Sequence, residues 1–483
     1  MKYKINNYLI LTIIIFGLLY SLISLVNHYN FRTYALDLGA YTNAMYDYIH
    51  FQWNDSTVFN EIKENLLADH FDLYLIIFSP LSLIFKTYTL LIVQIFMILF
   101  GGIGVYRYFS ISKSKYNVAL LATIYFYMFF GVFSAVSFDY HSNVIAASLV
   151  PWFFYFFKQK KHITTCIILL LLLISKENIS LWVAFICIGL LFEYKNDKIS
   201  LRYLLTFFLI SILYFILITS VVMPALSNSG TYPHFHYSSL GNNPFEVLKF
   251  IFSHPLESIK LLFVNYINHP LGNYVKIELH ILVLTSGLFI LFKKPHYILM
   301  LIPIYFQKLF NDNYEMWGIG GQYSIEFAPI LAIGIFSVIS EFKNIKLLKI
   351  VSVIALLGVI SSTIRVMDNT VIFTSKSKIR FYQETHYKRD YDVKTVYEQL
   401  NKIPDNVIVS AQTPFLPHLS LRDNIYQFPI VKDAEYIIYS NKEVKYPLNE
   451  KEFSIEIKKI LISNKWKTIF KSEDIVILKR KIL

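Results

Sequence analysis

Long apolar runs alternate with short polar segments along the first 366 residues of the chain. A run of about 20 apolar residues crosses the hydrocarbon core of a bilayer as a helix. We expect spans at 8–26, 89–109, 117–136, 142–157, 163–175, 179–192, 203–223, 278–292, 296–310, 321–340 and 347–366. The pattern therefore predicts a polytopic α-helical membrane protein of about 11 spans.

Lysine and arginine gather in a subset of the polar segments, and this asymmetry predicts the orientation. The basic clusters lie at 2–4, 107–115, 158–162, 195–202, 293–296 and 343–349. Cytoplasmic loops carry an excess of Lys and Arg, so we expect these clusters and the N-terminus on the cytoplasmic side of a cell membrane. The polar segments without that excess, at 31–70, 138–141, 176–178, 228–276 and 311–323, are then expected outside.

Two segments depart from simple spans. Residues 71–85 are apolar but interrupted by Ser79-Pro80, and a crossing there would invert every later cluster. We therefore expect this segment to be interfacial or re-entrant on the outer side, beside an amphipathic helix near 36–48 that lies on the membrane.

Residues 163–192 are broken by Lys176-Glu177 and flanked by basic residues, which predicts a hairpin. Its legs are shorter than the bilayer core is thick, so its tip should lie below the outer surface.

The character of the chain changes after residue 366. Residues 367–483 carry many charges, and strand-like runs lie at 407–411, 436–439, 468–471 and 474–480, with a helix expected over 450–466. This pattern predicts a small soluble α/β domain, large enough for its own core. With eleven spans before it, the domain is expected to be extracytoplasmic.

Composition adds few constraints beyond the apolar pattern. The chain is 55% hydrophobic and carries a net charge of +12, much of it in short loops beside apolar runs. Such charge sets orientation and meets anionic membrane lipid. No basic-aromatic platform or groove-reading motif accompanies it, so we expect no nucleic-acid partner.

The outer segments carry the candidate chemistry, and each has a structural alternative. Asp37 is either the cap of the following helix or a general base at the outer surface. Asp69-His70 is either a cap with a solvated His, or a pair in which Asp orients His or binds a divalent cation. Asp139 and His141 lie in a very short loop, which is either a plain hairpin turn or part of a substrate site.

The remaining candidates are a charged pair and a glycine-rich loop. Lys176-Glu177 at the hairpin tip is either a structural ion pair or a phosphate-binding group. Glu315, Gln322 and Tyr323 belong to an outer loop that either binds substrate or is simply flexible. Acids, a lysine, histidines and aromatic rings around one cavity suit a phosphorylated or lipid-linked sugar. Aromatic rings stack on sugars, carboxylates accept hydroxyl protons, and a cation holds phosphate.

The ordered series of motifs resembles the DUF2079-type predicted membrane proteins, a family of unknown function. The matching stretches are Ala35-Leu36-Asp37-Leu38-Gly39 with Asn43, Ala68-Asp69-His70-Phe71, Ser137-Phe138-Asp139-Tyr140-His141, Ser175-Lys176-Glu177-Asn178, Gln322-Tyr323-Ser324 before Pro329, Pro414 to Ser420, and Ala434-Glu435-Tyr436. The chain departs from the family pattern at Asn143 and Asn178, where family members often carry an acid.

That family is similar to the GT-C superfamily of membrane glycosyltransferases. The resemblance implies that Asp37 is the catalytic base, that Asp69 and His70 are its neighbours, and that Lys176 binds the donor phosphate. It also implies a membrane glycosyltransferase that uses a polyprenyl-phosphate-linked sugar donor, with inverting-type transfer to an acceptor hydroxyl on the extracytoplasmic face. We expect any cation to be Mg²⁺ or Mn²⁺ at Asp37 and Asp69. The acceptor, a glycan, lipid or protein, stays open.

Two other classes of function stay open beside the enzyme. A transporter or flippase of a lipid-linked substrate would carry paired ionisable residues near mid-membrane, whereas here they gather toward one side. A non-catalytic membrane assembly protein would act by binding through its soluble tail.

Overall fold

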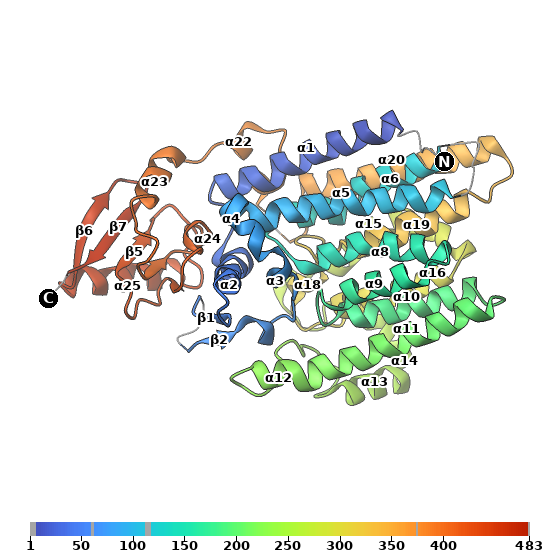
Figure 1. Cartoon of the computed structure of the whole chain (residues 1–483), viewed down its shortest axis with the longest axis horizontal. Coiled ribbons are helices and arrows are strands. Elements are labelled where there is room, and N and C mark those ends of the chain that lie inside the picture. The colour runs from blue at the N-terminus through green and yellow to red at the C-terminus, as the bar shows by residue number, and fades with distance from the viewer. Residues whose placement is uncertain (1–5, 59–61, 112–116, 373–374, 482–483) are drawn as a thin grey trace.

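The computed structural model describes residues 6–58, 62–111, 117–372 and 375–481. Figure 1 shows a bundle of helices that run along the long axis of the molecule, with a small sheet at one end. The main bundle helices are α1 (Asn7–Tyr29), α5 (Thr89–Ser110), α6 (Val118–Met128), α7 (Phe130–Val136), α8 (Ser142–Lys158), α9 (His162–Leu173), α10 (Ile179–Glu193), α11 (Lys198–Leu217), α15 (Val275–Thr285), α19 (Phe327–Ile339) and α20 (Ile345–Asp368).

These helices overlap the apolar runs of the sequence, but not all of them are long enough to cross a membrane alone. Within the described residues, four helical segments are long and apolar enough to cross a membrane: Asn7–Tyr29, Tyr74–Ser110, Lys198–Leu226 and Ile345–Asp368. A fifth joins them if α6 and α7, which meet at a 47° bend, form one span. Helices α9, α10 and α19 are apolar but shorter. The chain is therefore a helical membrane protein with four or five candidate spans, and the predicted number of about 11 spans stays a prediction.

Basic residues that are distant in the sequence meet at one end of the bundle. Lys160 Nζ lies 2.8 Å from an Asp197 carboxylate oxygen, which joins the loops before α9 and α11. Lys294 Nζ lies 2.6 Å from a Glu341 carboxylate oxygen, which joins the loops before α16 and α20. In Figure 1 this end lies away from the C-terminal sheet. The structure therefore places the clusters at 158–162, 195–202 and 293–296 at one end of the bundle. The cluster at 2–4 and residues 112–115 lie outside the described residues, and the side of the membrane that the basic end faces stays a prediction.

Further short elements connect the bundle helices and fill both ends and the periphery of the bundle. They are α2 (Ala40–Ile49), β1 (Asp55–Ser56), β2 (Glu64–Asn65), α3 (Tyr74–Phe78), α4 (Ser82–Phe85), α12 (Met223–Leu226), α13 (Pro244–Ser253), α14 (Pro255–Leu261), α16 (His296–Leu299), α17 (Ile302–Leu309) and α18 (Tyr314–Trp317). A 3-10 turn at Ser79-Pro80 joins α3 to α4, so residues 74–85 are short helical pieces that belong to the candidate span Tyr74–Ser110 rather than to a span of their own.

Helix α2 corrects one expectation. An amphipathic helix lying on the membrane would expose one face, yet Tyr41, Ala44 and Met45 are all buried. Asn43 is buried as well, and its amide donates to the backbone carbonyls of Ser420 (3.2 Å) and Arg422 (2.7 Å). Helix α2 is therefore enclosed between the bundle and the C-terminal region.

The C-terminal region forms a mixed five-stranded sheet with short helices. Its elements are α21 (Lys376–Ile379), α22 (Glu384–Tyr387), α23 (Val393–Leu400), β3 (Val409–Ala411), α24 (Leu416–Leu419), β4 (Ile425–Gln427), β5 (Tyr436–Tyr439), α25 (Glu450–Ile462), β6 (Trp466–Lys471) and β7 (Val476–Arg480). The strand order is β4-β3-β5-β7-β6, with β3 parallel to both neighbours and β7 antiparallel to both of its own. The predicted α/β character is confirmed.

One side of this sheet region packs directly on the bundle. Phe415 and Leu416 belong to the same buried cluster as Ala35 and Leu38 of the first polar segment. A second, smaller core includes Phe428, Ile437, Tyr439, Phe453, Val476 and Leu478. The C-terminal region thus has a core of its own on one side, and on the other it is joined to residues 31–58.

Asp47 at the end of α2 gives a testable consequence of this enclosure. Burial, reinforced by the charge of Asp423, raises the pKa of Asp47 to about 7. The free energy of unfolding should therefore fall between about pH 4, where the unfolded carboxyl ionises, and about pH 7, where the folded one does. Asp47→Asn should remove this loss and stabilise the protein by about 2 kcal/mol near pH 8, after allowance for residual solvent screening.

Thermal or urea unfolding in detergent at about pH 4 and pH 8 measures this difference. Glu398→Gln is the control, because Glu398 is exposed on α23 and its charge does not contribute to the raised pKa of Asp47. A gain at pH 8 that equals the gain at pH 4 would contradict the prediction.

Candidate functional site

Asp37 lies in a distorted π-helical turn, Ala35–Gly39, just before α2. Its backbone has φ 70° and ψ −98°, a conformation that costs a non-glycine residue roughly 1–3 kcal/mol unless the surroundings enforce it. Two hydrogen bonds fix the chain on the N-terminal side of the turn. The backbone N–H of Tyr34 donates to Asp139 Oδ2 (2.9 Å), and that of Ala35 donates to Thr413 Oγ1 (3.1 Å). The turn is thus fastened to the loop between α7 and α8 and to the C-terminal region.

The carboxylate of Asp37 faces an imidazole rather than a helix end. Asp37 Oδ1 lies 3.2 Å from His141 Nε2, and about a fifth of the Asp37 side chain is exposed. Helix α2 begins after Gly39 and has no side-chain cap, so the interpretation of Asp37 as its cap is wrong. The backbone N–H of His141 donates to Gln94 Oε1 (3.0 Å) on α5, which positions the ring. A positioned carboxylate beside His is an arrangement that can accept a proton.

Asp139, which accepts the hydrogen bond from the Tyr34 N–H, is buried beside this turn. It is 1% exposed, and its Oδ1 has no hydrogen-bond partner among the described residues. Burial raises the pKa of Asp139 to about 6, although the nearby charge of Lys378 opposes the rise. Lys378 itself is buried, with its ammonium 4.7 Å from the centre of the Tyr34 ring. Asp139 therefore holds the backbone of the Asp37 turn, with a C-terminal lysine as a neighbouring charge.

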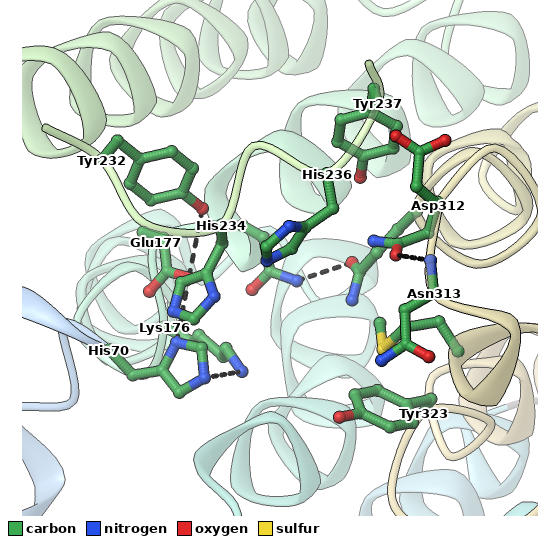
Figure 2. Close-up of a pocket in the computed structure, with 14 residues that line it drawn as sticks. His70, Lys176, Glu177, Tyr232, His234, His236, Tyr237, Asp312, Asn313 and Tyr323 are labelled. Carbon is green, nitrogen blue, oxygen red and sulfur yellow. Dashed lines mark hydrogen bonds and ion pairs between the residues drawn. The ribbon is translucent and has the colours of Figure 1, made fainter. Parts of the chain in front are cut away.

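A second cluster forms where the tip between α9 and α10 meets residues 69–71 (Figure 2). His70 Nδ1 lies 3.3 Å from Glu177 Oε1, and His70 Nε2 lies 3.1 Å from Lys176 Nζ. The backbone N–H of Phe71 donates to Glu177 Oε2 (3.2 Å). Burial alone raises the pKa of Glu177, but His70 and Lys176 outweigh it and bring the pKa to about 2. Glu177 is thus a buried carboxylate held in its charged form.

His234 completes this cluster, although the sequence did not single it out. Its Nε2 lies 3.2 Å from Asp69 Oδ1, and its ring stacks on that of His70 with centroids 4.2 Å apart. Within the described residues, Asp69, His70 and His234 each offer a ligand atom, all within 4.8 Å of one another, as a metal site requires. Asp37 is outside this group, so the structure does not pair it with Asp69 as a ligand. The signal in the sequence was the histidine-rich stretch around 232–236.

A polar cavity of 370 Å³ opens beside the second cluster (Figure 2). Its lining includes His70, Lys176, Glu177, Tyr232, His234, His236, Tyr237, Asp312, Asn313 and Tyr323. Four of these were candidates from the sequence, namely His70, Lys176, Glu177 and Tyr323. Histidine, acid, amide and tyrosine groups on several walls make the cavity suited to a polar ligand.

The other candidates lie outside this lining. Glu315 is exposed near the start of α18, and Gln322 is buried, with no hydrogen-bond partner for its Oε1 in the described part of the chain. Asp37 and His141 form their own pair, and Tyr41 lies within electrostatic range of both Asp37 and Glu177. The candidate residues therefore form two neighbouring clusters rather than a single ring.

An apolar groove of 530 Å³ adjoins the polar cavity. Its walls include Leu181, Trp182, Phe185, Phe215, Ile302 and Phe306 from the region of α10, α11 and α17. The groove and the cavity share the lining residues Asn178, Tyr232, His234, Tyr237 and Gln307. A molecule with an apolar chain and a polar head therefore finds both kinds of surface side by side.

The fold and these clusters define a helical membrane protein with a polar cavity at one end of the bundle and a sheet region fastened beside it. Residues 27–476 match a family described as predicted membrane protein (DUF2079). The chain belongs to this family, and the match spans both the helical part and the C-terminal region. No curated protein matches the chain.

Proposed function

We propose that this protein is a membrane glycosyltransferase that takes a sugar from a polyprenyl-phosphate donor and transfers it to an acceptor hydroxyl. The observation that carries the proposal is the shared wall between the 530 Å³ apolar groove and the 370 Å³ polar cavity. A prenyl chain fits an apolar surface, whereas phosphate and sugar need charged and hydrogen-bonding groups.

The donor would lie across that wall. Its chain would follow the apolar groove along α10, and its phosphate would meet Lys176 at the hairpin tip. Lysine is a common partner for phosphate as a compact positive charge. The sugar would occupy the cavity, where the rings of Tyr237 and Tyr323 offer stacking surfaces. Glu177 would hold the ring of His70 through Nδ1, and His70 Nε2 in turn contacts Lys176 Nζ.

Asp37 would act on the acceptor. Its partly exposed carboxylate would remove the proton from the acceptor hydroxyl, and the oxygen would attack the anomeric carbon as the bond to phosphate breaks. The electron pair of that bond leaves with the phosphate, and attack from the opposite side inverts the anomeric centre. His141 would orient the carboxylate, and Asp139 would hold its turn. Asp37 or Asp69 would also be the place for Mg²⁺ or Mn²⁺ if the reaction uses one.

The proposal includes the topology expected from charge. About 11 crossings, with the N-terminus in the cytoplasm, would place both clusters and the C-terminal region on the extracytoplasmic face. The grouping of basic residues at the opposite end of the bundle supports this arrangement.

The direct test is transfer by the purified full-length protein from polyprenyl-phosphate sugars to a panel of glycan, lipid and peptide acceptors. The expected result is a new glycosidic product, detected by mass spectrometry, together with release of polyprenyl phosphate. Movement of the donor across proteoliposomes without any product would instead indicate a transporter or flippase. Binding of envelope components with neither product nor flux would indicate a membrane assembly protein.

A further inference from the structure

We infer that Asp69, His70 and His234 form a binding site for one divalent transition-metal ion of the zinc type. Their ligand atoms lie within 4.8 Å of one another. Asp69 and His234 are already in contact, because His234 Nε2 lies 3.2 Å from Asp69 Oδ1 and 2.6 Å from the Asp69 carbonyl oxygen. A divalent ion replaces the proton that these atoms share, as metal binding to histidine commonly does.

The donor set selects the class of ion. Two imidazoles and one carboxylate are the ligands that zinc takes in sites with an open fourth position. Mg²⁺ prefers an octahedron of oxygen atoms and keeps several waters, so it is poorly served by two nitrogen donors. The site thus contains Asp69 without Asp37, and its two imidazoles distinguish it from the pair of carboxylates expected from the sequence.

Glu177 is the carboxylate that a metal-binding histidine usually contacts through the ring nitrogen that does not bind the metal. Its Oε1 lies 3.3 Å from His70 Nδ1, and the backbone N–H of Phe71 holds its other oxygen. The Glu177 side chain is 2% exposed, so the carboxylate is shielded from competing water. A carboxylate on one ring nitrogen fixes the tautomer and directs the other nitrogen to the metal. In His70 that other nitrogen is Nε2.

Lys176 gives the site a distinctive behaviour. Its Nζ lies 3.1 Å from His70 Nε2, so the ammonium and a metal ion compete for the same nitrogen. Lysine has a flexible stem, and its head can move into the cavity that it lines when the ion binds. The remaining positive charge still opposes a divalent ion at this distance. Removal of the lysine charge is therefore expected to strengthen metal binding, which a general disturbance of the fold does not do.

The open coordination position is expected on the cavity side, because His70 and His234 both line the polar cavity. An ion there would meet the polar end of whatever occupies the cavity. This inference concerns metal binding alone and does not depend on the proposed transfer reaction.

The test is titration of chelator-treated full-length protein with Zn²⁺, followed by calorimetry, and with Co²⁺, followed by its visible absorption bands. We expect one site per chain. His234→Ala and Asp69→Asn should each weaken it by at least about tenfold, as loss of metal-site groups does. His236→Ala is the matched control, because His236 lies in the same segment and lines the same cavity but is outside the ligand group.

Lys176→Met provides the decisive measurement and should tighten Zn²⁺ binding by about tenfold through loss of the opposing charge. Thermal unfolding of each variant shows whether it is folded. Equal affinity in His234→Ala and His236→Ala, weaker or unchanged binding in Lys176→Met, or Mg²⁺ bound as tightly as Zn²⁺ would each overturn the inference.

Discussion

Asp37→Asn is expected to lower the rate of sugar transfer by about 100- to 10,000-fold, the range that general-base catalysis supplies. Asparagine has nearly the same shape but cannot take a proton from an acceptor hydroxyl. The hydrogen bonds that fix the turn come from the backbone N–H groups of Tyr34 and Ala35, not from the Asp37 side chain, so the turn should be retained. The loss should therefore fall on kcat, with little change in the affinity for the lipid donor, whose proposed contacts lie elsewhere.

Initial rates measured over a range of donor concentrations, at saturating acceptor, separate kcat from the affinity for the donor. Asp55→Asn is a suitable control, since it removes an exposed acid from the same polar segment without touching either cluster. Wild-type turnover in Asp37→Asn would remove Asp37 from the mechanism. A large fall in donor affinity with normal kcat would show that Asp37 binds substrate rather than the acceptor proton.

The helices followed from the sequence because apolar runs leave little choice of conformation inside a bilayer. Helix α1 and helix α20 match the predicted spans 8–26 and 347–366 closely. The number of crossings did not follow, because α9, α10 and α19 are shorter than a bilayer core and only their packing decides how far they reach. The bend between α6 and α7 has the same effect, since a single apolar run became two helices.

Part of the candidate site could be predicted from the sequence. The residues that were missed lie far in the sequence from the residues that they contact. Lys176 and Glu177 were found because a charged break in an apolar run is costly unless it has partners. His70 was found as part of the Asp69-His70 pair just before the apolar segment 71–85. Their contacts with one another then confirm that the breaks converge. His234 was missed because it lies in a long polar loop, where a histidine has no reason in the local pattern to be buried or exposed.

The contribution of the C-terminal region was the least predictable part. Thr413 and Lys378 reach the Asp37 turn from more than 300 residues away, and neither stands in a recognisable motif. Strand β4 was missed for a similar reason, because it has only three residues and gains its stability from parallel pairing with β3. Such contacts depend on the assembled sheet, which no local pattern describes.

Gly101→Val is expected to destabilise the folded protein by about 3 kcal/mol, the upper part of the usual range for overpacking. Helices α5 and α8 approach closely at this glycine. A Cβ atom there would lie 2.8 Å from Ser148 Cα and 2.9 Å from the Ser148 carbonyl oxygen, both backbone atoms. A backbone atom cannot turn aside as a side chain can, so the two helices must separate.

Moving helices α5 and α8 apart should also displace residues of the candidate site. Helix α8 begins directly after His141, whose backbone N–H is held by Gln94 on α5. Thermal unfolding in detergent measures the loss of stability, and Gly17→Val is the matched control. A Cβ at Gly17 would meet only the end of the Leu99 side chain, at 3.2 Å, which can rotate away. Equal stability losses in the two variants would show that the α5–α8 contact is not the constraint, and the position of His141 would then need another support.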